Sequence, residues 1–316
     1  MKADKINRLN RNTAVYRTIV FLFISVFCCS MGCRSIPFYR MTNKASQGLI
    51  LSREGITAYE HGDLDLAEKK LKEAVDLNKT DIEAQRYYAE TLWQGGKEQE
   101  ALDVLQAAIK KKGSQDNELI LNQTLGEKLL LLHRPEEAFL CGERMIYLDP
   151  KKFEGWIVRA NACWQLGKKE EALADYQRGL YLSPDNRDIL WQLAHLQNSI
   201  GSFDRALATW QHLGRLYPVN TEPPEVLYGK AEAYYHLKRH QDAAENLQLA
   251  IKLSPDKKEY YRLLSNVWLE KGDISSALTV AAQMVERAPQ DPESLDLYRK
   301  IEQIRLAAID RENKLR

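Results

Sequence analysis

The sequence predicts an all-α fold of seven consecutive helix–turn–helix repeats, and two registered residue series carry this prediction. Alanines recur at separations of 34 or 37 residues. They are Ala67, Ala101, Ala138, Ala172, Ala206, Ala243 and Ala277. Five of them are followed twelve residues later by a proline, at Pro150, Pro184, Pro218, Pro255 and Pro289. Because proline lacks an N–H group and disfavours helix in the residue before it, each proline marks the end of a repeat's second helix.

The composition agrees with a folded, helix-prone chain. Hydrophobic residues make up 44% and charged residues 28% of the 316 residues, with few glycines and prolines. Repeats of this kind pack only on their neighbours, so the length does not require two globular domains. The 45 basic and 44 acidic residues nearly cancel. Since nucleic-acid binding needs a clustered positive surface, we expect no nucleic-acid partner.

Each repeat combines small, large and turn-forming residues at fixed places. Small residues in the first helix allow the two helices to approach closely, at Gly55, Ala89, Gly126, Ala160, Ala194, Ala231 and Ser265. Large residues in the second helix fill the space beside that contact, at Leu71, Leu105, Tyr176, Trp210 and Leu247. Glycines fall where the first helix should end in a left-handed residue, at Gly62, Gly96, Gly167, Gly201 and Gly272. The remaining repeats place another residue there.

These positions resemble the tetratricopeptide repeat (TPR) family, whose repeats are 34 residues long. The fourth repeat matches best, with Trp156, Ala160, Gly167, Ala172, Tyr176, Leu180, Leu182 and Pro184 at the family's positions. The first two repeats depart in having Lys79 and Gly113 where proline is usual. The resemblance implies a right-handed superhelical solenoid with repeats at 48–81, 82–115, 119–152, 153–186, 187–220, 224–257 and 258–291. It covers about three quarters of the chain.

Residues between and after the repeats have predicted roles of their own. Three-residue insertions at Asp116–Glu118 and Thr221–Pro223 are expected to lengthen loops between repeats. After the last repeat, residues 292–316 are predicted to form one long helix with Leu297 and Ile301 on its apolar side. Such a helix caps the solenoid, which would otherwise expose an apolar face.

The N-terminus, residues 1–33, reads as an export segment rather than as part of the fold. Basic residues precede an apolar run at 19–29 that is short for a membrane span but suits a signal peptide. Residues 30–33, Ser-Met-Gly-Cys, resemble a bacterial lipobox, which implies lipidation of Cys33. Simple secretion and an uncleaved membrane anchor remain open. Residues 34–47 are predicted to be a polar tether, and the repeats to be exported and held at the membrane of the cell envelope.

Reactive and metal-binding groups give little reason to expect chemistry. The chain has no glycine-rich phosphate loop, HExxH pair or GxSxG motif, so we expect neither an enzyme nor a cofactor or metal site. His236 and His240 are four residues apart, but the repeat register places His240 in a turn. Cys141 and Cys163 are read as buried free thiols, with a disulfide as the alternative.

The TPR resemblance also implies a binding surface. In the family the first helices line a concave groove, and positions four, eight and eleven residues after each repeat's start face it. Here they hold Tyr59, Arg86, Glu90, Trp93, Gln123, Asn161, Trp164, Trp191, His195, Asn198, Tyr228, Glu232, Tyr235, Arg262 and Asn266. Aromatic rings and amides suit binding of a peptide. The alternative is that some of these rings cover the packing seam between repeats.

The predicted function is therefore a noncatalytic scaffold of the cell envelope that binds other proteins or peptides and no small-molecule cofactor. The alternatives are a regulatory or assembly subunit of an envelope enzyme complex and a peptide receptor.

Overall fold

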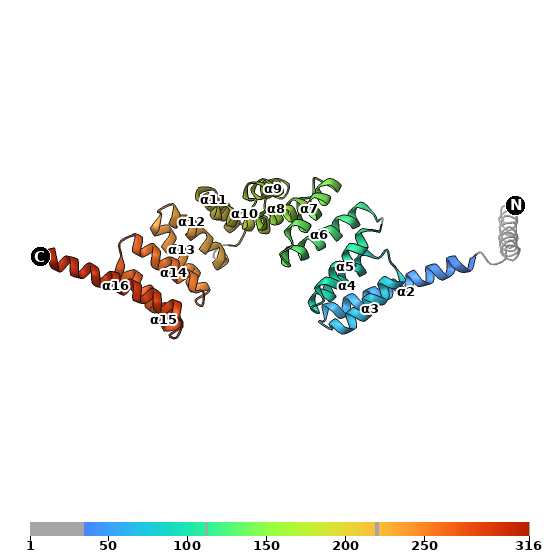
Figure 1. The fold of residues 1–316 in the computed structure, drawn as a ribbon, viewed down its shortest axis with the longest axis horizontal. Coiled ribbons are helices and arrows are strands. Elements are labelled where there is room, and N and C mark those ends of the chain that lie inside the picture. Colours follow the sequence, from blue (N-terminus) through green and yellow to red (C-terminus); the bar gives the residue numbers. More distant parts are fainter. Residues whose placement is uncertain (1–34, 112, 219–220, 316) are drawn as a thin grey trace, which may run out of the picture. The chain divides into compact units, whose positions relative to one another are not determined.

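The computed structural model describes residues 35–111, 113–218 and 221–315, and these residues form fifteen α-helices and no strand (Figure 1). The export segment with Cys33 lies outside the described residues. The chain divides into two compact parts, and the boundary in the sequence falls between Gly113 and Ser114. None of the described helices is long and apolar enough to cross a membrane.

The N-terminal part contains the first two repeats. Its helices are α2 (Ser35–Glu60), α3 (Leu64–Leu77), α4 (Ile82–Gln94) and α5 (Glu98–Ile109). Ala67, Leu71, Ala89 and Ala101 are fully buried where the paired helices meet. A Cβ atom added to Gly55 would lie 2.6 Å from Leu71 Cγ, so the absence of a side chain at residue 55 permits this close approach.

Helix α2 begins earlier than the sequence predicts. Residues 35–47, assigned above to a polar tether, are helical and continuous with the first helix of repeat 1. The physical reason is that Pro37 falls in the first turn, where proline is tolerated, and no proline or glycine follows before Gly48. At Gly48 the helix already packs on the second helix, because an added Cβ atom there would lie 2.9 Å from Asn78 Cβ.

The C-terminal part contains the other five repeats and a final helix. The first helices of these repeats are α6 (Gln115–Leu131), α8 (Phe153–Gln165), α10 (Arg187–Ser199), α12 (Pro224–His236) and α14 (Lys258–Glu270). The second helices are α7 (Pro135–Leu148), α9 (Lys169–Leu182), α11 (Phe203–Arg215), α13 (His240–Leu253) and α15 (Ile274–Arg287). Each helix packs on the next, and three pairs of first helices also touch, α6 with α8, α10 with α12, and α12 with α14.

The core lies between these paired helices and follows the predicted small and large positions. The small residues Ala160, Ala172, Ala194, Ala206, Ala231, Ala243, Ser265 and Ala277 are fully buried. Tyr176, Trp210 and Leu247 are fully buried beside them. Cys141 and Cys163 are buried free thiols, and burial raises the pKa of Cys141 to about 12.

The turns within repeats adopt the predicted left-handed backbone. Gly62, Gly96, Gly167, Gly201 and Gly272 have φ angles between 72° and 84°. In the two repeats without glycine, His133 (φ 54°) and Lys238 (φ 62°) take the same conformation. The turn geometry is therefore kept even where a side chain makes it costly.

One of the two predicted loop insertions is wrong. Asp116–Glu118 does not lengthen a loop but forms the first turn of α6, whose N-cap is Ser114 with its Oγ accepting from the Asn117 N–H. Two carboxylates in this turn favour helix because they face the positive end of the helix dipole. Thr221–Pro223 lies outside helices, as predicted.

The predicted C-terminal helix is confirmed as α16 (Pro292–Leu315). Ile301 is fully buried in a cluster with Ala277 and Ala281 of α15. The Asp291 carboxylate accepts from the Ser294 N–H at 2.9 Å and pairs with Lys258. These hydrogen bonds lower the pKa of Asp291 to about 2, with Lys258 as the largest cause.

Candidate functional site

The four predicted groove residues of the N-terminal part lie on α2 and α4. Gln94 Nε2 donates to Tyr59 Oη at 2.7 Å, and the Tyr59 ring meets the Tyr87 ring edge-on at 5.4 Å. The Arg86 guanidinium lies over the Tyr87 ring. Burial and then the Glu90 carboxylate raise the pKa of Tyr59, whereas the Arg86 guanidinium lowers it. Trp93 is half-buried near the end of α4.

A hollow of about 560 Å³ opens on the first helices of repeats 3, 4 and 5. The predicted residues Asn161 and Trp164 of α8 line it. The other lining residues are Glu127, Leu130, Leu131, Gln165 and Gln192. Glu127 and Leu130 fall eight and eleven residues after the start of repeat 3. Both therefore stand at groove-facing positions of the repeat, although they are not among the predicted groove residues. Gln165 and Gln192 fall one position outside that register.

Contacts with a buried tyrosine fix the side chains that line this hollow. The Tyr176 hydroxyl, from the fully buried ring in α9, donates to Asn161 Oδ1. The Trp164 ring meets the same tyrosine ring edge-on, with centroids 6.2 Å apart. On α6, Gln123 Nε2 donates to the Glu127 carboxylate at 3.0 Å. The hollow thus offers an apolar wall from α6, an indole face, and amides whose orientation the core fixes.

Trp191 and His195 of α10 contact the second helix of their own repeat. Both rings pack against Trp210 of α11, with centroid distances of 5.2 Å and 4.9 Å. Burial lowers the pKa of His195, which favours its neutral form. Both half-buried rings therefore pack on the second helix of their own repeat.

The predicted residues of α12 and α14 form a polar network beside a stacked ring pair. Tyr228 stacks on the buried Tyr260 at 5.1 Å, and burial followed by the Glu232 carboxylate raises the pKa of Tyr228. Asn198 Nδ2 of α10 donates to Glu232 at 2.7 Å. Arg262 lies close enough to oppose that pKa shift and pairs with Glu293 at 2.8 Å.

The last two predicted residues lie farther along α12 and α14. Tyr235 Oη donates to Glu270 at 2.6 Å, and burial together with this carboxylate raises the pKa of Tyr235 to about 12. Asn266 is half-buried on α14.

The two histidines of the spaced pair belong to different helices. His236 ends α12 and stacks on the Phe203 ring at 4.1 Å, whereas His240 is the first residue of α13 rather than part of the turn. Within the described ranges, no group of three or more His, Cys, Asp or Glu side chains is placed to hold a metal ion.

Three matches to tetratricopeptide repeat family descriptions cover most of the chain. They span residues 52–117 and 188–258, residues 153–186, and residues 234–301. The chain is a tetratricopeptide repeat protein. The match confirms the family that the alanine and proline series predict.

Curated relatives match part of this chain. The curated relatives include the BBSome complex member BBS4 of Bos taurus, 27% identical over 129 residues, which are 41% of this chain and 24% of that protein. Another is an N-terminal acetyltransferase A complex subunit-like protein of Schizosaccharomyces pombe, 29% identical over 128 residues, 40% of this chain and 18% of that protein. The chain thus matches a quarter or less of the length of these relatives.

Solved structures confirm the fold at low identity. PilF from Pseudomonas aeruginosa has a TM-score of 0.59 at 15% identity, covering 71% of this chain and 99% of that one. A tetratricopeptide repeat protein from Parabacteroides merdae has a TM-score of 0.56 at 17% identity, covering 81% and 99%. MamA from Desulfovibrio magneticus has a TM-score of 0.52 at 19% identity, covering 57% and 99%. The chain is therefore an all-α TPR solenoid, and repeats of this family serve as protein-interaction scaffolds.

Proposed function

We propose that this TPR protein binds a partner polypeptide through the first-helix face of repeats 3 to 5. The observation that carries the proposal is the 560 Å³ hollow on α6, α8 and α10. Its size suits an apolar side chain of a partner together with part of that partner's backbone. The exposed Leu131 and the Trp164 ring supply apolar contact, and large rings of this kind often carry the binding energy of interfaces.

The polar groups of the hollow favour a polypeptide over a small apolar ligand. Asn161, Gln165 and Gln192 present side-chain amides, which can donate to and accept from a peptide backbone. Asn161 and Gln165 are already oriented by hydrogen bonds to Tyr176 and to the Leu130 carbonyl. Preoriented amides lower the entropy cost of binding.

A matched pair of surface variants tests this proposal. Leu131 on α6 and Leu140 on α7 are exposed to a similar degree, 64% and 62%, but only Leu131 lines the hollow. We expect Leu131→Glu to abolish retention of the protein's natural binding partner in affinity purification, and Leu140→Glu to leave retention unchanged. Equal retention by both variants would show that recognition lies elsewhere.

We further propose that the chain acts at the membrane of the cell envelope, held by a lipid on Cys33. The basic flank, the short apolar run and the lipobox-like residues 30–33 support this placement. Helix α2 begins at Ser35, two residues after this cysteine, so lipidation would attach the membrane directly to the helical part of the chain. Cys33→Ser should release the protein to the soluble fraction or leave an unprocessed precursor. A variant that matures and stays membrane-bound would refute lipidation at Cys33.

The alternative role, a subunit of an enzyme complex, draws support from the S. pombe relative, whose name describes it as subunit-like in an acetyltransferase complex. Crosslinked membranes distinguish the two roles. Several envelope proteins recovered with the chain support a scaffold, whereas one stoichiometric enzyme supports a subunit.

A further inference from the structure

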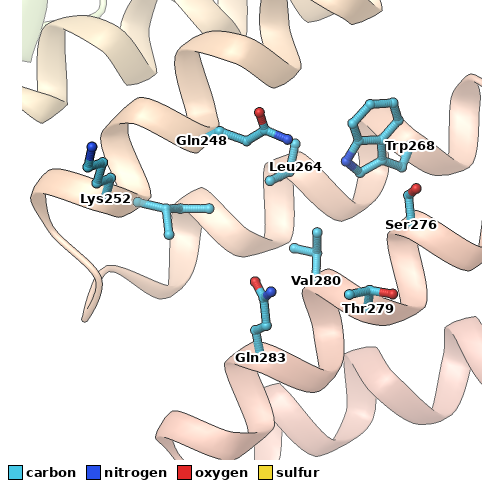
Figure 2. Close-up of a pocket in the computed structure, with 9 residues that line it drawn as sticks. Gln248, Lys252, Leu264, Trp268, Ser276, Thr279, Val280 and Gln283 are labelled. Carbon is cyan, nitrogen blue, oxygen red and sulfur yellow. The ribbon is translucent and has the colours of Figure 1, made fainter.

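A second hollow lies among the last two repeats, on helices that the first hollow does not use. It measures about 390 Å³ and opens between α13 and α15, with α14 as its floor (Figure 2). Ile251 of α13, Leu264 and Trp268 of α14, and Val280 of α15 form its apolar lining. Gln248 and Lys252 stand on the α13 wall, and Gln283 stands on the α15 wall.

The apolar lining of this hollow differs from the matching positions of repeat 4. In repeat 4 the guanidinium of Arg159 pairs with the buried Asp175 at 2.7 Å. Arg159 and Asp175 stand six and twenty-two residues after the start of repeat 4. The same positions in repeat 7 hold Leu264 and Val280. Two apolar side chains thus stand in repeat 7 where repeat 4 has an ion pair.

The polar groups on the rim are available to a ligand. Gln248 and Gln283 are exposed, and neither side chain forms a hydrogen bond within the part of the chain that the structure describes. Lys252 is also exposed and forms no ion pair with the described residues. No acidic residue lines the hollow, so its one charged group favours a carboxylate.

We propose that this hollow is a second polypeptide-binding site, which takes an extended segment of a partner protein bearing one apolar side chain and one carboxylate. The apolar side chain packs on Leu264, Trp268 and Val280. Two free amides on opposite walls suit an extended backbone, because each can both donate to and accept from a peptide group. The carboxylate of the segment pairs with Lys252.

The test uses defined peptides and the full chain. Fluorescein-labelled octapeptides built from Gly and Ser carry one Leu and one Glu, separated by none to three residues, and a second series carries Lys in place of Glu. Binding is measured by fluorescence polarization. We expect a Glu peptide to bind about tenfold or more tightly than its Lys counterpart, and Lys252→Glu to reverse that preference.

Two further variants locate the binding. Leu264→Arg combined with Val280→Asp installs the ion pair of repeat 4 and should abolish binding by filling the hollow. Gln248→Ala combined with Gln283→Ala changes only exposed side chains, so it should weaken binding while circular dichroism stays unchanged. This glutamine double variant tests the proposal even if Leu264→Arg with Val280→Asp disturbs folding. Leu131→Glu, which disables the first hollow, should leave peptide binding intact.

Three outcomes would overturn the proposal. They are the absence of binding at millimolar peptide, equal affinity for the Glu and Lys series, and binding that persists unchanged in the Gln248→Ala, Gln283→Ala variant. Loss of binding in Leu131→Glu would also overturn it, because recognition would then lie in the first hollow.

Discussion

Gly229 of α12 lies against the fully buried ring of Trp210, and this contact gives a sharp prediction of stability. A Cβ atom added at Gly229 would lie 2.3 Å from Trp210 Cε2 and 2.5 Å from Cζ2. The ring has little room to move, because Trp191 and His195 pack on it at 5.2 Å and 4.9 Å. Gly229→Ala should therefore strain the core of repeats 5 and 6.

Two opposing terms set the size of the effect. Alanine favours an α-helix over glycine by about 1 kcal/mol. Overpacking of a well-packed core costs about 1–3 kcal/mol, and a rigid buried ring places this site at the upper end. The net expectation is a loss of about 1–2 kcal/mol in the free energy of unfolding, measured by urea unfolding followed by circular dichroism.

A control and a second background make the prediction specific. At Gly179 an added Cβ atom would lie 2.6 Å from Ile157 Cδ1, the end of a flexible side chain, so Gly179→Ala should cost clearly less. In a Trp210→Leu background the ring is gone, and Gly229→Ala should become neutral or stabilising. If Gly229→Ala destabilises both backgrounds equally, the ring contact is not the cause and the reasoning fails.

Three other predictions follow from single residues. Ala172→Leu should destabilise the chain by about 1–3 kcal/mol, because Ala172 is fully buried where α8 and α9 meet, and an unchanged unfolding curve would mean that the repeat register is mistaken. His133→Gly should raise the free energy of unfolding by about 0.5–1 kcal/mol, because glycine adopts the left-handed backbone at this position without strain. Gly167→Ala should lower it, because alanine is strained in that conformation. Thermal melting that shows the same sign for both variants would contradict this account. Because the pKa of Asp291 is lowered to about 2, its contribution to stability is present above the unfolded pKa of about 4 and is lost as pH falls through about 2. Asp291→Asn should therefore lose less stability than wild type between pH 5 and pH 2, and identical acid dependence in both proteins would count against the pairing with Lys258.

The sequence predicts the helices and core well because one periodic signal repeats along the chain. An alanine every 34 or 37 residues places a small residue where two helices meet, and the buried residues Ala172 and Ala206 confirm the register. The extent of α2 was missed because residues 35–47 lie outside the repeat, where no periodic signal applies. The helical conformation of Asp116–Glu118 was not predicted, because the spacing of the repeats shows that three residues are added but not whether they form a loop or a helix.

The candidate site is predicted less completely, because register gives the face of a helix but not the depth of a side chain. Trp164 and Trp191 stand at positions eleven and four of their repeats, yet Trp164 lines a hollow while Trp191 packs on Trp210. Both tryptophans contact a buried ring on the second helix of their own repeat, Tyr176 beside Trp164 and Trp210 beside Trp191, so that contact does not separate them. Tyr228 stacks on Tyr260, so its truncation should also cost stability.

Site-specific photocrosslinking tests the central claim most directly. A benzoylphenylalanine at position 131 sits at the hollow on α6, α8 and α10, and the same group at position 140 is a control of equal exposure on α7. We predict a discrete protein adduct from position 131 in cells that express the chain at its native level, the loss of that adduct on Gln192→Ala with Trp164→Phe, and none from position 140. Equal adducts from both positions, or an adduct from position 140 alone, would contradict binding through the first-helix face.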